Sequence, residues 1–322
     1  MFPLQMSRLV VSIFPNAKAL PLWAGAAQGL FAARQLDLVI HETGSSREQR
    51  GLLASGEIHI VQAAIDNALA MIKAGHDVVI LMGGEGGMND LIVQADIGSL
   101  KHLAGRTLAV DSPDTAYALL LRKVLAANGL EKDKGYQLQA IGNGSKRLRA
   151  LLKDKTLAGT ILNPPFSAEA LLSGMRSLGR LDDLVGPYQA GGAFALRSFA
   201  EKSGAAVEAY IQGYVASLDW LRNPQNADAC ERLLQEKLSI SSEVARATYL
   251  QLCDPVSGFA PQARLNWTGI RAMLDVRAAT EGRDAQIEAT GAYVDESYYQ
   301  RALADMARTN SNTRSAETSE RS

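Results

Sequence analysis

Cysteine and histidine are scarce in this chain of 322 residues. There are two cysteines, Cys230 and Cys253, and four histidines. Two cysteines in the last third of the chain do not make a disulfide framework, and neither residue type recurs at the spacing of a zinc site. We therefore expect free structural cysteines, no metal site and no bound cofactor.

Net charge and long apolar segments are lacking too. Lysine and arginine number 33 against 34 aspartates and glutamates, which leaves a formal net charge of -1. Without a basic block, the chain has no electrostatic feature that would attract nucleic acid. No apolar run reaches the ~18 residues of a membrane span. We therefore expect neither a nucleic-acid partner nor direct insertion into a membrane.

The two ends of the sequence lead to separate expectations. Residues 1–7, MFPLQMS, do not place a basic segment before an apolar stretch, as a signal peptide does. The sequence as it stands therefore predicts a cytoplasmic protein, and a periplasmic location requires a signal sequence outside it. Residues 310–322 contain a single apolar side chain, Ala316, so we expect a disordered tail there.

The most informative segment is GNGSKRLRALLKDKTLAGTILNPP, residues 142–165. Asn143 and Ser145 are suited to cap a helix, and the leucines that follow share one helical face. A short apolar strand then ends at Asn163, because the two prolines after it cannot donate hydrogen bonds to a sheet. Since ligands of open α/β sheets bind beyond the carboxyl ends of the strands, we expect this region to face a ligand.

Strands and helices alternate along the chain, which predicts an α/β fold with largely parallel sheets. Strands are expected at residues 8–14, 36–41, 58–63, 78–82, 89–94, 107–110, 137–140, 159–162 and 192–196. Helices are expected to begin at Ser46 and to cover residues 20–33, 67–74, 115–128, 145–153, 206–221, 228–237, 242–252, 267–281 and 298–307. The glycine-rich residues 83–87 are expected to form a flexible turn, since they lack the lysine of a phosphate loop.

The order of these elements predicts two lobes with a ligand cleft between them. Residues 1–93 and 192–309 are expected to form a discontinuous first lobe, and residues 94–191 the second. The segments 89–94 and 192–196 would cross between the lobes. Two such crossings make a hinge.

Several short motifs occur in the order that a known family shows. They are Pro15-Asn16, Gln28-Gly29-Leu30-Phe31, Ser55-Gly56-Glu57-Ile58-His59-Ile60, Asp111-Ser112, Arg147-Leu148-Arg149-Ala150-Leu151, Asn163-Pro164-Pro165, Tyr188-Gln189 and Trp220-Leu221-Arg222-Asn223-Pro224-Gln225-Asn226. Over residues 8–305 the chain resembles the periplasmic binding protein-like II proteins of the nitrate, sulfonate and taurine transport group, the SsuA/THI5-like or NMT1-like family.

The resemblance implies a type II periplasmic binding protein fold, in which two α/β lobes close on one small molecule and deliver it to an ABC importer. It also implies an expected monomer with an ABC permease as partner. The family contains cytosolic enzymes on the same fold, among them a thiamin-precursor synthase and an aromatic sulfinate desulfinase. The fold alone therefore does not decide between a receptor and an enzyme.

The expected ligand-binding residues follow strand ends and begin helices on both sides of the cleft. In the first lobe they are Asn16, Lys18, Ser45, Ser46, Gln62, Asp66 and Asn67, and in the second they are Ser112, Thr115, Asn143 and Asn163. Helix starts present free N–H groups and a positive dipole end, which favours an oxyanion such as a sulfonate, carboxylate or nitrate-like ligand. Each of the polar residues can instead be a helix cap. A carboxylate at Asp66 would suit an amine or a ring N–H, as in a thiamin-precursor-like heterocycle.

Enzymatic chemistry has little support in the sequence. The desulfinase branch needs a thiolate after the first strand, where this chain has Pro15 and Asn16. The cofactor lysine and the histidine of the thiamin-precursor branch fall on Ala63 and Asn67. We therefore expect the substrate-binding protein of an ABC importer without catalytic residues. The alternative is a cytosolic sensor, or a cytosolic lyase or decarboxylase that uses cleft residues such as Lys18, Asp66 and Asp111.

Overall fold

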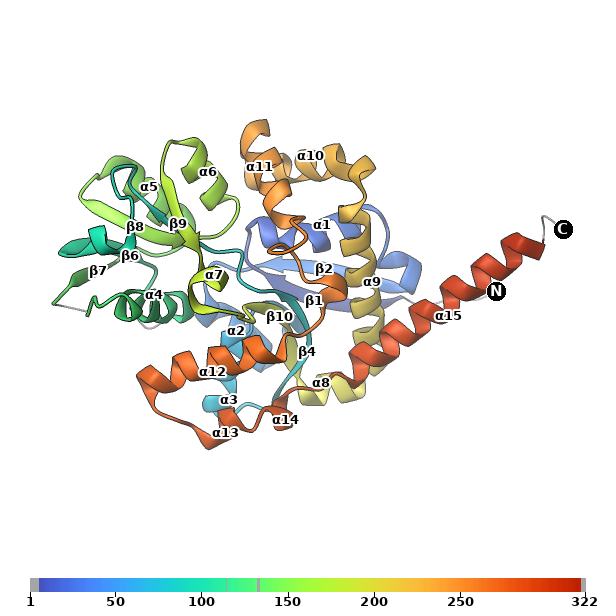
Figure 1. The fold of residues 1–322 in the computed structure, drawn as a ribbon. Coiled ribbons are helices and arrows are strands. Elements are labelled where there is room, and N and C mark those ends of the chain that lie inside the picture. The colour runs from blue at the N-terminus through green and yellow to red at the C-terminus, as the bar shows by residue number, and fades with distance from the viewer. Residues whose placement is uncertain (1–5, 114, 132–133, 320–322) are drawn as a thin grey trace.

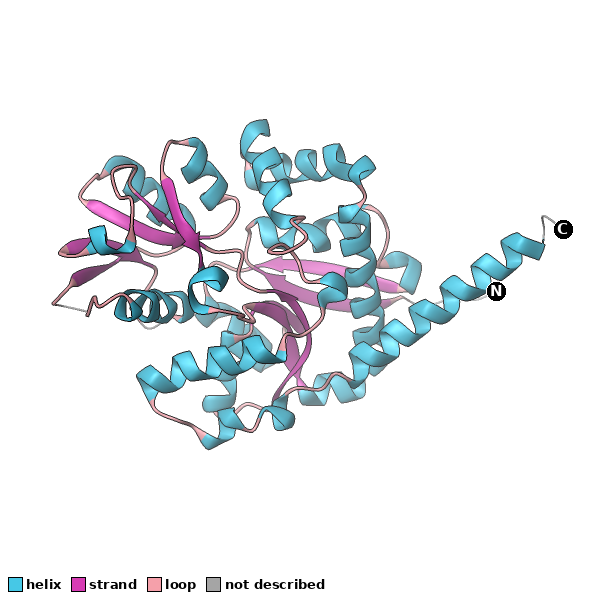
Figure 2. Ribbon diagram, in the orientation of Figure 1, coloured by secondary structure: helices cyan, strands magenta, loops and turns pink. Residues whose placement is uncertain are grey.

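Two five-stranded sheets form the framework of the protein (Figures 1 and 2). The computed structural model describes residues 6–113, 115–131 and 134–319. The first sheet contains, in spatial order, β2 (Leu36–Glu42), β1 (Ser7–Ile13), β3 (Ile60–Ala64), β10 (Gly191–Leu196) and β4 (Val78–Glu85). The second contains β7 (Tyr136–Ala140), β6 (Arg106–Val110), β8 (Leu157–Leu162), β5 (Asp90–Val93) and β9 (Arg176–Arg180).

Both sheets are parallel on one side and antiparallel on the other. β1 pairs in parallel with β2 and β3, and β6 pairs in parallel with β7 and β8. β10 and β5 are the antiparallel insertions, since β10 lies between β3 and β4, and β5 lies between β8 and β9. The chain passes from the first sheet to the second after β4 and returns just before β10. The sequence also predicts two crossings, which it places at residues 89–94 and 192–196.

Helices cover both sheets. Those that follow first-lobe strands or the return crossing are η1 (Ala17–Ala19), α1 (Leu20–Ala27), η2 (Ala32–Arg34), α2 (Ser46–Ser55), α3 (Asp66–Lys73), α8 (Arg197–Lys202), α9 (Gly204–Arg222), η4 (Pro224–Asn226), α10 (Ala227–Leu238), α11 (Ser242–Leu252), η5 (Pro261–Ala263), α12 (Trp267–Glu281), α13 (Ala285–Glu288), α14 (Thr290–Tyr293) and α15 (Ser297–Ser319). The second lobe has η3 (Leu100–Leu103), α4 (Ala116–Ala127), α5 (Gly144–Lys153), α6 (Phe166–Leu172) and α7 (Leu181–Val185). Of the described helices, none is both long and apolar enough to cross a membrane.

The core continues from one lobe into the other. One cluster of buried side chains joins β1 to α1 and α9, with Leu9, Val11 and Tyr210 among its members. A second cluster includes Phe194 of the first sheet and Leu108 of the second, together with residues of α3, α4 and α12. Because α12 contacts α4, the lobes meet through an apolar surface on that side.

Most predicted elements are confirmed within two residues at each end. The α/β class and the type of each predicted element agree with the structure. The predicted helix 20–33 is shorter, because α1 ends at Ala27 and Gly29 takes a left-handed φ of 66° before η2. Residues 166–185, for which the sequence predicted no element, form α6, β9 and α7.

Three predictions are wrong. Residues 83–87 are not a flexible turn as a whole, since Gly83 to Glu85 are the buried end of β4. A side chain at Gly83 would come within 2.4 Å of the Arg264 carbonyl oxygen, so the glycine allows close backbone packing there. Both crossings also come earlier than the predicted segments 89–94 and 192–196, because β5 already pairs inside the second sheet and β10 already pairs inside the first.

The third correction concerns the tail. α15 continues as a helix to Ser319 and projects from the body of the protein in Figure 1, where disorder was expected from Asn310. Residues 297–319 contain neither glycine nor proline, so no residue there breaks a helix. The remainder of the predicted tail, residues 320–322, lies outside the described residues, as do residues 1–5 of the predicted first lobe.

Candidate functional site

The loop after β1 places Lys18 beside the first crossing. The Asn16 side chain accepts a hydrogen bond of 2.9 Å from the Lys18 backbone N–H and starts η1. Lys18 Nζ then lies 3.0 Å from Glu85 Oε1 and donates a hydrogen bond of 2.6 Å to the Gly87 carbonyl oxygen. The Lys18 side chain is 17% exposed and that of Glu85 is 6% exposed, so the ion pair is mostly shielded from solvent.

Lys18 also faces the second lobe. Its Nζ lies 6.0 Å from the centre of the Tyr117 ring, which belongs to the first turn of α4. Burial lowers the pKa of Lys18, but the Glu85 carboxylate and Tyr117 outweigh burial and raise the pKa above its ordinary 10.5. Lys18 is therefore a protonated group enclosed by both lobes.

A second ion pair joins the start of α3 to α12. Asp66, at the start of α3, accepts a hydrogen bond from Arg277 Nη1 of α12. Tyr188, in the second crossing, is 5% exposed, and burial followed by the Asp66 charge raises its pKa well above the ordinary value. The carboxylate that the sequence offered to an amine ligand is thus paired with an arginine in this structure.

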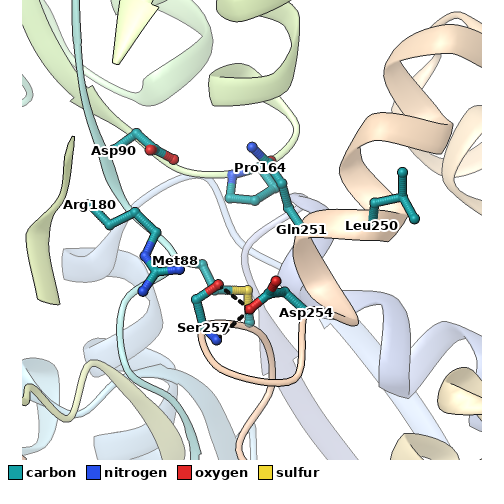
Figure 3. A pocket seen from close by; sticks show the side chains of 8 residues that line it. All are labelled: Met88, Asp90, Pro164, Arg180, Leu250, Gln251, Asp254 and Ser257. Atoms are coloured by element: carbon teal, nitrogen blue, oxygen red, sulfur yellow. Dashed lines mark hydrogen bonds between the residues drawn. The ribbon is translucent and has the colours of Figure 1, made fainter. Parts of the chain in front are cut away.

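A pocket of about 330 Å³ opens between the lobes on the α11 side (Figure 3). Both lobes contribute residues to its walls. The lining residues are Met88, Asp90, Pro164, Arg180, Leu250, Gln251, Asp254 and Ser257. This volume lies at the lower end of the ~300–1,000 Å³ typical of small-molecule sites. It is a candidate ligand pocket because neither lobe forms it alone.

The titratable residues of this pocket have different environments. Burial raises the pKa of Asp90, whose Oδ1 accepts a hydrogen bond of 3.0 Å from Ser177 Oγ. Hydrogen bonds from the Ser257 hydroxyl and N–H, each 2.7 Å long, hold the pKa of Asp254 below its usual range. In Figure 3 the Arg180 side chain points toward the turn that contains Asp254 and Ser257.

Three of the predicted ligand-binding residues serve as helix caps. Besides Asn16, the Ser45 hydroxyl accepts a hydrogen bond of 3.2 Å from the Glu48 N–H, and the Asn143 side chain accepts one of 3.1 Å from the Lys146 N–H. The Glu48 carboxylate in turn accepts hydrogen bonds from Gly44 and Thr43, so the α2 start resembles a capping box. The cap interpretation, which the sequence left open, holds for these residues.

The other predicted residues make varied contacts. Gln62 binds the Tyr210 and Tyr214 hydroxyls of α9, and Asn67 accepts a hydrogen bond of 2.8 Å from Arg50. Thr115 Oγ1 donates to Asp111 and to the Ser112 carbonyl oxygen. The Asn163 side-chain amide donates a hydrogen bond of 3.4 Å to the Pro164 carbonyl oxygen. Among the described residues, the side chains of Ser46 and Ser112 form no hydrogen bond.

The sequence interpretation missed Glu85, Tyr188, Arg277 and the pocket residues Asp90, Arg180 and Asp254. One signal was available for Glu85, since a lone carboxylate directly after five apolar residues and two glycines marks the carboxyl end of a buried strand. Nothing local marks Arg277, which lies 211 positions after its partner Asp66.

Within the described residues no three histidine, cysteine, aspartate or glutamate side chains gather as a metal site requires. The described cysteines, Cys230 and Cys253, are free, and burial raises the pKa of Cys230 to about 12. The prediction of free cysteines is confirmed.

Comparison with known proteins places this geometry in a family. Residues 4–235 match the NMT1-like family. The chain belongs to the NMT1-like family. No curated protein sequence matches it closely enough to count as a relative.

Solved structures show the same fold at low sequence identity. A protein from Bordetella bronchiseptica RB50 is 18% identical, with a TM-score of 0.77 over 94% of this chain and 99% of that one. The periplasmic aliphatic sulphonate binding protein SsuA from Escherichia coli is 18% identical, with a TM-score of 0.71 over 84% and 86%. The periplasmic nitrate-binding protein NrtA from Synechocystis PCC 6803 is 13% identical, with a TM-score of 0.74 over 94% and 89%. These similarities confirm the predicted type II periplasmic binding protein fold.

Proposed function

We propose that this protein is the substrate-binding component of an ABC importer and that it binds one small molecule between its lobes. The observation that carries the proposal is the pocket of about 330 Å³, whose walls come from two lobes joined by two crossings. Such a pocket is completed only when the lobes approach, which couples ligand binding to closure. The similarity in fold to SsuA and NrtA supports the same function.

The proposal includes location and partner. We place the protein in the periplasm as a monomer that docks on an ABC permease. Sequencing the upstream region and the adjacent genes tests this directly. An in-frame signal sequence beside permease and ATPase genes supports the receptor, and their absence favours the cytosolic enzyme or sensor.

The enzyme alternative has no support from Cys230 or Lys18, the cysteine and the lysine considered as nucleophiles. A thiol with a pKa of about 12, as in Cys230, is protonated at neutral pH, and Cys230 is fully buried in the core beside α1 and α9. Lys18, the cleft amine, has a raised pKa, whereas a nucleophilic lysine needs a lowered one. Neither side chain is therefore an activated nucleophile.

A ligand screen followed by product analysis separates the two functions. Sulfonates, carboxylates, nitrate, amines and pyrimidines are tested for thermal stabilisation, and each stabilising compound is incubated with the protein and measured by mass spectrometry. Recovery of the intact compound supports the receptor. A new product whose formation stops in Lys18→Met, while thermal unfolding shows that the variant is still folded, overturns the proposal and favours the enzyme.

A further inference from the structure

Two carboxylates face the interlobe pocket from opposite walls. Asp90 belongs to β5 of the second sheet, and Asp254 follows α11 of the first lobe. The Oδ1 atom of each is engaged: that of Asp90 by the Ser177 hydroxyl, and that of Asp254 by Ser257 and the Val256 N–H. Among the described residues no hydrogen bond is recorded to either Oδ2 atom, so each wall retains acceptor capacity.

The one guanidinium in the pocket lining forms its ion pairs with carboxylates outside the lining, and its charge also acts on Asp90 and Asp254. Arg180 Nε and Nη2 lie 3.2 Å and 3.3 Å from the two carboxylate oxygens of Asp182, and Nη2 lies 3.2 Å from Asp183. Arg180, Asp182 and Asp183 together therefore contribute one positive and two negative charges. With Asp90 and Asp254 added, the surroundings of the pocket are acidic, which disfavours a simple anion.

The rest of the lining suits an organic body. Met88, Pro164 and Leu250 supply apolar surface, and Leu250 is 61% exposed. Gln251 Oε1 accepts a hydrogen bond of 3.2 Å from Ser167 Oγ, so this amide is fixed at the junction of α6 and α11. An apolar lining with a few polar groups is typical of small-molecule sites.

We propose that this pocket binds a compact organic cation, such as a primary amine or amidine on an apolar body, with its N–H groups held between Asp90 and Asp254. The inference rests on the proposed function and narrows its ligand class away from the oxyanions that the sequence suggests. Charge-assisted hydrogen bonds from an ammonium group to two carboxylates are among the stronger polar contacts in proteins. Lys18 does not compensate these carboxylates, because its charge is paired with Glu85.

Three probes of similar size and different charge test the ligand class. Benzylamine, benzyl alcohol and benzoate are titrated separately into the full-length protein, and binding is followed by NMR chemical shifts at millimolar concentrations. We expect benzylamine to bind at least about tenfold more tightly than benzoate, with benzyl alcohol between them, since its ammonium group can donate charge-assisted hydrogen bonds to the two carboxylates. Equal affinities, a preference for benzoate, or no binding of any probe would overturn the proposal.

Matched variants test the two carboxylates. Asp90→Asn and Asp254→Asn should each weaken benzylamine binding by about tenfold and leave benzyl alcohol almost unchanged. Asp96→Asn is the control, because Asp96 has a side chain 70% exposed and pairs only loosely, at 3.8 Å, with Arg106. Thermal unfolding of each variant confirms folding. If both pocket variants bind benzylamine as the parent does, the cation is not held between these residues.

The outcomes also separate this inference from the proposed function. If a transported compound compacts the protein and binds Asp90→Asn and Asp254→Asn as tightly as the parent, the receptor function is supported and the cation pocket is contradicted. Conversely, benzylamine can bind in a way that depends on both carboxylates while no tested compound compacts the protein. That result supports the cation pocket and contradicts the receptor function.

Discussion

Lys18 and Glu85 form a mostly buried ion pair across 67 positions of sequence, with 3.0 Å between Nζ and Oε1. The pair joins the loop after β1 to the last residue of β4, directly before the chain crosses to the second lobe. Glu85 Oε2 also accepts a hydrogen bond from the Gly87 N–H, and Lys18 donates to the Gly87 carbonyl oxygen. These bonds fix the first residues of the crossing to the first lobe.

Removing one member of this pair should destabilise the protein strongly. Glu85→Gln or Lys18→Met leaves the other charge shielded and without its counter-ion, which typically costs about 3–5 kcal/mol. Urea unfolding measures the change. The exposed pair Glu131 and Lys134, with side chains 71% and 83% exposed, provides the control, and Lys134→Met should change the unfolding free energy by less than about 1 kcal/mol. Similar effects of both lysine variants would contradict a buried pair.

The stabilisation by Lys18 should depend on pH in a defined direction. Its folded-state pKa lies above the ordinary 10.5, so its contribution is complete below pH 10.5 and is lost as the pH rises through the folded-state pKa. The difference in unfolding free energy between the parent and Lys18→Met should therefore stay constant from about pH 7 to pH 10 and narrow above that. A difference that shrinks between about pH 7 and pH 9 would show that the pKa is not raised.

The order of elements was predictable because local signals mark it. Ser45 caps α2, Gly56 takes a left-handed φ of 78° at its end, and apolar β3 follows. The same sequence of cap, helix and strand recurs from Asn143 to Leu162. These signals act within a few residues, so each could be recognised from sequence alone.

The site was less predictable because its contacts join distant segments. Residues that begin helices were selected as ligand contacts, yet a free N–H at a helix start is satisfied equally well by a cap, as at Ser45. Asp66 looked available to a ligand, but its partner Arg277 comes from α12. The pocket residues Asp90 and Asp254 line one pocket because the chain returns to the first lobe and packs α11 against α6 of the second.

The neighbouring serines of α2 allow stability and binding to be separated. Ser45→Ala removes the cap and should lower the free energy of unfolding by about 1 kcal/mol without changing ligand affinity. Ser46→Ala removes no recorded bond within the described residues, so it should leave stability within about 0.5 kcal/mol. If Ser46 contacts the ligand, its variant should weaken binding by about 1–3 kcal/mol. Titration calorimetry with the transported compound decides, and unchanged affinity would remove Ser46 from the site.

Two glycines in helices should respond oppositely to alanine. A Cβ at Gly213 of α9 would lie 2.3 Å from Phe31 Cδ1, so Gly213→Ala should destabilise the core by about 1–3 kcal/mol. A Cβ at Gly51 of α2 would meet no atom within 4 Å, and alanine is the better helix former, so Gly51→Ala should stabilise the protein by about 0.5–1 kcal/mol. Chemical unfolding of both variants tests the packing of Phe31, at the start of η2, against α9. A neutral Gly213→Ala would show that Phe31 moves freely.

Closure of the lobes can be tested through a bond that spans them at the pocket wall, where the acceptor Gln251 belongs to the lining and the donor Ser167 does not. Ser167 of α6 is fully buried and donates a hydrogen bond of 3.2 Å to Gln251 of α11. Because this bond exists only when the lobes meet, Ser167→Ala should destabilise the closed form by about 0.5–1.5 kcal/mol and weaken ligand binding by up to about tenfold. Small-angle scattering should show a smaller radius of gyration with saturating ligand, and Ser167→Ala should require more ligand to reach it. Ser55→Ala, on the exposed end of α2, should behave as the parent. An unchanged radius at saturation would exclude a hinge that closes on its ligand.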